Sequence, residues 1–150
     1  MAIERLLSLL RRHRRIALDS SIFIYQLDSN QRYLHLTTSV FMWLEPPAHR
    51  AVTSTVTWTE LLVPAYRSSE QKRIDQYINL FSTYPHLEWI APDLAIADLA
   101  ARLRARYELR TPDALQAATA IEAGATLLLT NDRAFRRIGD LATLLLDDLL

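Results

Sequence analysis

The chain has 150 residues, of which 50% are hydrophobic and 23% are charged, a composition that fits one globular domain and excludes bulk disorder. It contains no cysteine, which excludes disulfide bonds, thiolate nucleophiles and cysteine-ligated metal centres and suits a reducing cytoplasm. The zero net charge argues against a protein that coats nucleic acid non-specifically, although a local basic patch remains compatible with it. No apolar run approaches the ~20 residues of a membrane-spanning helix, so we expect no membrane partner.

Short apolar runs alternate with helical patterns along the chain. Strands are expected, in order, at 16–18, 51–53, 87–90, 126–129 and 143–146. Helices are expected at 1–10, 22–27, 31–44, from 55 or 57 through 62, 69–82, from 92 to about 107, 111–124 and 134–138. Because buried strands alternate with helices, the sequence predicts a mainly parallel sheet that helices cover on both faces.

Three helix starts carry capping signals. Ser20 or Ser21 is expected to cap the helix over 22–27, and Pro92 is suited to the first position of its helix. In Thr111-Pro112-Asp113 we expect a capping threonine, a proline at the first position and an acid in the first turn.

The first fifteen residues form a basic N-terminal extension in this interpretation. The cluster Arg11 to Arg15, interrupted only by His13, precedes the first strand. We expect it to be a solvated segment, and contact with RNA is the alternative. With no linker or repeat, residues 1–150 are expected to form a single domain.

Four acidic residues are predicted to lie at the edge of the sheet where the strands end. Asp19 follows the first strand, and Asp132 follows the fourth. Asp113 begins the helix that leads into the fourth strand, and Glu60 lies about one turn into the helix after the second strand. Ligands gather at this edge in open α/β sheets, and converging carboxylates repel one another unless a cation compensates. The pattern predicts a site for Mg²⁺ or Mn²⁺, which could polarise a phosphoryl oxygen and activate water.

Each acid also has a structural interpretation when it is taken alone. Asp113 could complement the helix dipole, and Asp19 could cap the helix that follows it. Asp132 could form a turn, and Glu60 could be an ordinary surface acid. The metal-site hypothesis depends on the four residues together.

Three arginines follow the last of these acids. Arg133, Arg136 and Arg137 could bind backbone phosphates of RNA near the metal. The alternative is a solvated helix face, and the sequence favours neither.

Four segments resemble the motifs of the PIN domain and, more narrowly, those of VapC toxins of bacterial toxin–antitoxin pairs. They are LDSSIFIY at 18–25, TWTELL at 57–62, TPDALQAATA at 111–120 and LLLTNDRAF at 127–135. Their order and spacing match across residues 16–146. The resemblance implies one PIN-like domain, a three-layer α/β/α sandwich with a mainly parallel central sheet of about four to five strands.

The same resemblance implies a Mg²⁺- or Mn²⁺-dependent ribonuclease. It places catalysis and metal ligation on Asp19, Glu60, Asp113 and Asp132. Thr130 and Asn131 would support the last acid, and Ser20 and Ser21 stand where the family usually has other polar residues and could hydrogen-bond a carboxylate. An RNA substrate, a homodimer, a cognate antitoxin and a cytoplasmic location are also implied.

Two other functions remain open from the sequence. One is a PIN module that binds RNA without useful turnover. The other is a metal-dependent phosphatase that acts on small phosphate esters. Metal-dependent cleavage of RNA would distinguish the nuclease from both alternatives.

Overall fold

The structure is a computed structural model that describes residues 1–84 and 86–150. Its strands are β1 (Arg15–Leu18), β2 (Arg50–Ser54), β3 (Leu87–Ile90), β4 (Leu128–Thr130) and β5 (Thr143–Leu145). They form one sheet in the order β3-β2-β1-β4-β5, and every neighbouring pair is parallel. The predicted parallel sheet is therefore confirmed. All strands begin at one edge, the amino edge, and end at the opposite edge, the carboxyl edge.

Most helices lie within a few residues of their expected positions, but the helix expected through 62 continues to Ser68 and the one expected over 134–138 is a 3₁₀ turn. They are α1 (Ala2–Leu10), α2 (Ser20–Leu27), α3 (Leu34–Trp43), α4 (Thr55–Ser68), α5 (Gln71–Thr83), α6 (Leu94–Arg106) and α7 (Thr111–Glu122). Two short 3₁₀ turns follow, η1 (Arg133–Arg137) and η2 (Leu146–Leu149). No helix within the described ranges is both long enough and apolar enough to cross a membrane.

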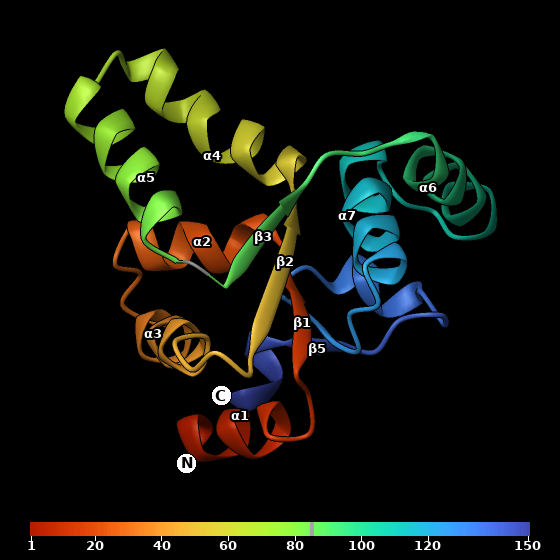
Figure 1. Ribbon diagram of the computed structural model, residues 1–150, viewed down its shortest axis with the longest axis horizontal. Helices are drawn as coiled ribbons and strands as arrows, with labels where there is room; N and C mark the ends of the chain where they lie inside the picture. The colour runs from red at the N-terminus through yellow and green to blue at the C-terminus, as the bar shows by residue number, and fades with distance from the viewer. Residues whose placement is uncertain (85) are drawn as a thin grey trace.

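Alternate residues of the strands enter two separate apolar cores. Ile16 and Leu18 of β1 pack into a core with α1 to α5, whereas Ala17 between them faces α6 and α7. Leu129 and Leu128 of β4 divide in the same way. Figure 1 shows α6 and α7 on one side of the sheet and α2 to α5 on the other. The three-layer α/β/α architecture is confirmed.

Small side chains set the position of α7. Ala114, Ala117, Ala118 and Ala120 are fully buried and let the helix approach the sheet closely. Gln116 then donates to the Thr57 hydroxyl at 2.5 Å, which ties α7 to α4. The first turn of α7, which contains Asp113, is thereby held near the carboxyl edge.

The N-terminal helix is part of the first core. Leu6 and Leu10 are fully buried, and Arg5 donates to the backbone carbonyls of Asp148 and Leu149 near the other end of the chain. The arginines after α1 differ, because the side chains of Arg11 and Arg12 are exposed.

The structure corrects the three predicted helix starts. Asp19, and neither Ser20 nor Ser21, caps α2, because its carboxylate accepts from the Ser21 backbone N–H at 3.0 Å. An aspartate also caps α6, which begins two residues after Pro92. A carboxylate in this position satisfies a free N–H and complements the helix dipole at once. Thr111 is the first helical residue of α7 rather than its cap, and no side chain caps that helix.

Candidate active site

Asp19 ends β1 and begins α2 at the carboxyl edge. One carboxylate oxygen accepts from the Ser21 hydroxyl at 2.5 Å and from its backbone N–H, and the other accepts from the Thr130 hydroxyl. The side chain is 5% exposed. Burial, with a smaller contribution from the charge of Glu60, raises the pKa of Asp19 to about 6, against the lowering effect of the bonds from Ser21 and Thr130.

Glu60 lies in the second turn of α4 and is half-buried. The helix begins where β2 ends, with the Ser54 hydroxyl accepting from the Val56 backbone N–H at 3.1 Å. Burial raises the pKa of Glu60, and so does the charge of Asp113, while Arg110 lowers it. The two acids therefore lie near enough to repel.

Asp113 lies in the first turn of α7 and is 7% exposed. The Arg110 guanidinium donates to its carboxylate through Nε at 3.2 Å. Burial nonetheless keeps the pKa of Asp113 above its ordinary value, and the charge of Asp132 adds to the increase.

Asp132 follows β4 and is half-buried. Its carboxylate accepts from the Ala134 backbone N–H at 2.9 Å, so it caps η1. Its own N–H donates to the Thr130 hydroxyl at 3.0 Å, and that same hydroxyl donates to Asp19. Thr130 thus links the first acid to the last.

The four carboxylates meet at one edge as neighbours in a row. The charge of Glu60 raises the pKa of Asp19, that of Asp113 raises the pKa of Glu60, and that of Asp132 raises the pKa of Asp113. Within residues 1–84 and 86–150, however, no three acidic or histidine side chains are placed to hold one ion as they stand. Their oxygen donors suit Mg²⁺ or Mn²⁺, and a cation would relieve the repulsion among partly desolvated acids.

The supporting residues form a hydrogen-bond network behind Asp19. The Asn131 backbone N–H donates to the Ser21 hydroxyl at 3.2 Å, and its side-chain amide donates to the Tyr25 hydroxyl at 3.1 Å. The Asn131 side-chain oxygen accepts from the Asp147 backbone N–H at 3.0 Å. Tyr33 donates to the Asp147 carboxylate at 2.5 Å, which raises the pKa of Tyr33 and lowers that of Asp147.

Four residues around the site escaped the sequence analysis. Arg110 could have been found, because a residue three positions before Asp113 lies beside it in a helical first turn. Tyr25 lies one turn after Ser21 on α2, which is a weaker signal. No local pattern connects Tyr33 with Asp147, since 114 residues separate them.

The three candidate RNA-binding arginines are exposed, but two already have partners. Arg136 forms an ion pair with Asp148, and Arg137 donates to the backbone carbonyl of Glu108. The charge of Arg133 lowers the pKa of Asp147. Phosphate binding by these arginines stays a prediction.

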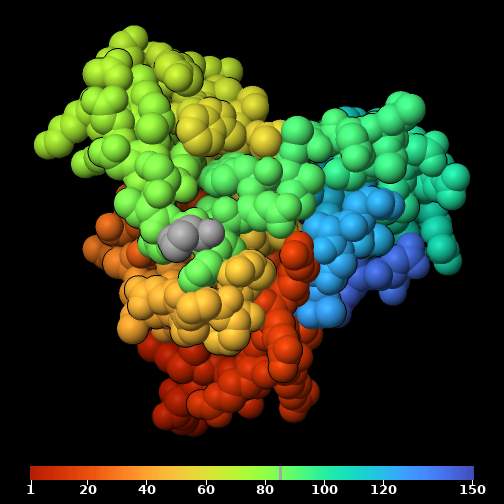
Figure 2. All heavy atoms as spheres, viewed as in Figure 1, coloured from red at the N-terminus to blue at the C-terminus, as the bar shows by residue number. Residues whose placement is uncertain are grey.

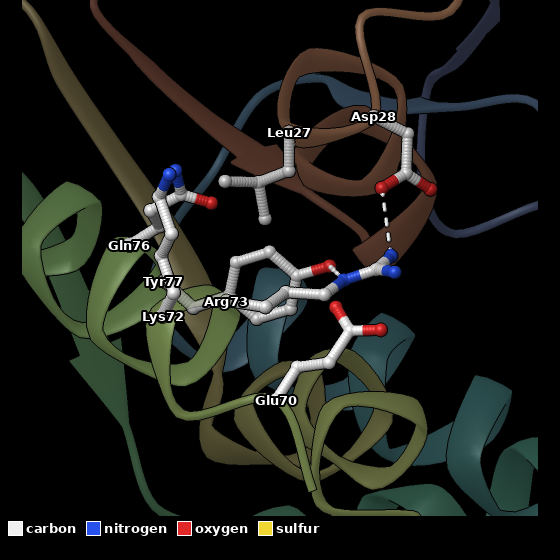
Figure 3. A pocket seen from close by; sticks show the side chains of 7 residues that line it. All are labelled: Leu27, Asp28, Glu70, Lys72, Arg73, Gln76 and Tyr77. Carbon is white, nitrogen blue, oxygen red and sulfur yellow. Dashed lines mark hydrogen bonds and ion pairs between the residues drawn. The ribbon is translucent and has the colours of Figure 1, made fainter. Parts of the chain in front are cut away.

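A separate cavity of about 390 Å³ lies between the end of α2 and the start of α5 (Figure 3). Arg73 within it is held by Asp28 at 2.9 Å and by the Tyr77 hydroxyl at 2.8 Å. The lining residues are Leu27, Asp28, Glu70, Lys72, Arg73, Gln76 and Tyr77. None of the four carboxylates belongs to it.

Comparison with known proteins supports the family resemblance. The model of the PIN domain family matches residues 16–141. No curated protein sequence matches the chain. Among solved structures, the fold is similar to a chain of VapBC2 from Rickettsia felis bound to a promoter DNA fragment, with a TM-score of 0.69, 20% identity, and coverage of 87% of this chain and 97% of the other.

Two further structures show the same similarity. A toxin–antitoxin complex from Klebsiella pneumoniae gives a TM-score of 0.61 at 26% identity, covering 85% of this chain and 96% of the other. VapC20 of Mycobacterium tuberculosis, a toxin that cleaves the sarcin–ricin loop, gives 0.61 at 17% identity, covering 83% and 95%. The chain belongs to the PIN domain family, with a VapC-like fold.

Proposed function

We propose that this chain is a Mg²⁺- or Mn²⁺-dependent endoribonuclease that hydrolyses RNA phosphodiester bonds. The observation that carries the proposal is the row of four carboxylates at the carboxyl edge, two of them nearly buried. Buried carboxylates with raised pKa values are costly to the fold, and such groups cluster at functional sites. Membership of a family of nucleases supports a hydrolase, and the similarity to an RNA-cleaving toxin supports RNA as the substrate.

Asp19, Glu60, Asp113 and Asp132 would hold one or two ions. A bound ion supplies a Lewis acid for the phosphoryl oxygen and lowers the pKa of water. Because no three of the described acidic or histidine side chains are placed to hold one ion as they stand, we expect the carboxylates to draw together on binding.

The remaining polar residues orient these acids. The hydroxyls of Ser21 and Thr130 each donate to one oxygen of Asp19 and so fix the plane of its carboxylate. Asn131 in turn fixes the Ser21 hydroxyl through its backbone N–H. Arg133 remains available at this edge to bind an RNA phosphate.

We further propose that the protein is the toxin of a type II toxin–antitoxin pair. The similarity to VapBC complexes supports a cognate antitoxin as partner. A homodimer, a cytoplasmic location and a single functional domain over residues 1–150 belong to the same proposal. Sedimentation of the purified protein, alone and with the product of any adjacent small gene, tests the two assemblies.

The nuclease proposal is tested by cleavage of single-stranded and hairpin RNA. We expect cleavage with Mg²⁺ or Mn²⁺, none with chelator, and a loss of at least about 100-fold in Asp19→Asn, because an amide lacks the charge that a hard cation needs. Asp93→Asn is the matched control, since Asp93 also caps a helix but follows β3, with β2 between it and β1.

Three results would contradict the proposal. Full cleavage by Asp19→Asn would remove the carboxylates from the mechanism. RNA binding without metal-dependent cleavage would favour the non-catalytic module. Release of phosphate from small phosphate esters, with RNA left intact, would favour the phosphatase.

A further inference from the structure

Arginines gather at the amino edge, where the strands begin, and the carboxylates lie at the carboxyl edge, where the strands end. Arg11 and Arg12 follow α1, and Arg14 directly precedes β1. Arg15 and Arg50 are paired in register at the starts of β1 and β2, and the Arg50 backbone N–H donates to the Arg14 carbonyl at 2.8 Å. The fold thus brings together two basic segments that are distant in sequence. We call these five residues the arginine edge. Figure 2 shows the N-terminal segment, in red, at the lower end of the molecule.

Most of this positive charge has no acidic partner. Arg11, Arg12 and Arg14 are exposed and form no ion pair within the described residues. Arg50 donates only to the backbone carbonyls at 47 and 49, which carry no net charge. Arg15 alone has an acidic partner, Glu88, at 3.3 Å. Five positive charges therefore meet one negative charge, in a chain whose net charge is zero.

The fold explains only part of this arrangement. Arg11 and Arg12 stand at the end of α1, where positive charge complements the helix dipole. No such reason applies to Arg14, which directly precedes β1, or to Arg50, which begins β2. A cluster of guanidinium groups in solvent presents paired donors that match phosphate oxygens.

The carboxyl edge itself gives phosphate little to bind. Without metal its acids repel a polyanion, Arg110 pairs with Asp113, and both Arg136 and Arg137 have partners in the fold, which leaves Arg133 of the arginines named at this edge. A bound metal ion and Arg133 would engage the phosphates near the cleaved bond, and a long RNA has further phosphates for cations elsewhere on the protein. We propose that the arginine edge binds backbone phosphates of the RNA at a distance from the bond that is cleaved, an inference that rests on the proposed nuclease function.

The distance between the edges determines which substrates would use this surface. The four residues of β1 span about 13 Å at ~3.3 Å per residue. A dinucleotide or a small chromogenic phosphodiester bound at the carboxylates cannot also reach the arginine edge. Only a longer RNA can contact both.

The experiment compares two triple variants with the same change in charge. Arg11→Gln, Arg12→Gln and Arg14→Gln together remove three of the five charges of the arginine edge, and Arg67→Gln, Lys72→Gln and Arg106→Gln remove three exposed charges elsewhere. Binding of a fluorescent hairpin RNA with a single-stranded tail is measured by anisotropy in chelator over a range of salt concentrations. If each arginine holds one phosphate, the slope of log affinity against log salt falls by about 2, at ~0.7 per contact, which is on the order of 100-fold in affinity near 0.1 M salt.

We expect the control triple to keep the wild-type slope and both triples to cleave the small phosphodiester at the wild-type rate. Arg14→Gln with Arg50→Gln is a second variant that leaves the end of α1 intact, and we expect it to lower the slope as well. Equal weakening by both triples would overturn the proposal, because bulk charge would then suffice. Unchanged RNA binding together with tight binding of polyglutamate would also overturn it and indicate an acidic protein partner.

The two proposals fail separately in this design. Cleavage of the small phosphodiester by the wild-type protein tests the nuclease without the arginine edge. Anisotropy in chelator tests the arginine edge without cleavage.

Discussion

At the carboxyl edge of the sheet, Asp19 and Asp113 are almost entirely buried, whereas Arg11, Arg12 and Arg14 at the amino edge lie in solvent. The acids are held by hydroxyls, backbone N–H groups and one guanidinium. The arginines mostly have no side-chain partner in the described part of the chain. Both edges concentrate one sign of charge, but only the carboxyl edge does so at a cost to the fold.

The difference indicates what each edge can tell about function. Removing a carboxylate from water is costly, so a fold that retains several of them favours a role for their charge. Exposed arginines cost little and are common on surfaces, so their role depends on what they bind. Single substitutions should therefore change stability at the carboxyl edge and leave it nearly unchanged at the amino edge.

The largest expected effect is the dependence of metal-free stability on pH. The pKa of Asp19 rises from 3.8 to about 6 on folding, so the folded protein binds this proton more readily than the unfolded chain. Its stabilising effect is complete below pH ~4 and is lost as the pH rises through about 6. This rise in the pKa of Asp19 corresponds to about 3 kcal/mol of unfolding free energy. Glu60 and Asp113, whose pKa values are also raised, act in the same direction.

Denaturant unfolding in chelator between pH 4 and pH 7 measures this loss. In Asp19→Asn the decrease should be smaller, because the titrating group is gone. Neutralising Arg14 should leave the wild-type pH profile unchanged. If the unfolding free energy of the wild-type protein stays level or increases from pH 4 to pH 7, the buried carboxylates do not destabilise the fold and the difference between the two edges is wrong.

Much of the carboxyl edge could be predicted from the sequence, because its position follows from topology. Asp19 and Asp132 directly follow short apolar runs, and parallel strands bring such positions to one edge. Which of two neighbouring polar side chains caps a helix was harder to predict. Asp19 and Ser21 are both good caps, and the carboxylate caps α2 while the serine hydroxyl donates to it.

Longer-range features could not be predicted because no local pattern encodes them. The contact between Tyr33 and Asp147 depends on how α3 and η2 pack around the end of the sheet. The burial of Leu6 and Leu10 depends on α3, which covers a helix that the sequence presents as an extension. The end of α4 could not be fixed from the sequence either, because Pro64 made it uncertain, and the helix includes this proline and continues to Ser68.

The next-largest expected effect is a pair of opposite stability changes when Asp113 and Arg110 are neutralised separately. Because burial keeps the pKa of Asp113 raised, Asp113→Asn should melt higher than wild type in chelator near neutral pH. Arg110→Gln should melt lower, since it leaves the acids without their nearest cation. We expect changes of up to about 1 kcal/mol, because Arg110 is largely exposed.

Thermal melts with and without Mg²⁺ or Mn²⁺ measure both variants. Added metal should raise the melting temperature of the wild type more than that of Asp113→Asn. Asp98→Asn is the matched control, since Asp98 forms an exposed ion pair with Arg102 on α6. If Asp113→Asn melts lower and gains as much from metal as the wild type, Asp113 is a partner of the helix dipole and not part of the site.

The smallest effect concerns how the carboxyl edge is anchored from behind. Tyr33→Phe removes the hydroxyl that donates to Asp147, whose backbone N–H holds the Asn131 side chain. We expect a loss of about 1 kcal/mol in unfolding free energy and a few-fold loss of cleavage, because Asn131 also fixes the Ser21 hydroxyl beside Asp19. Tyr66→Phe is the control, since Tyr66 is exposed on α4 and its hydroxyl forms no hydrogen bond in the described residues. Denaturant unfolding and RNA cleavage are measured on the same preparations. If Tyr33→Phe lowers stability but cleaves RNA at the wild-type rate, the network supports the fold and not catalysis. Only the four carboxylates and their direct partners would then distinguish the carboxyl edge from the amino edge in function.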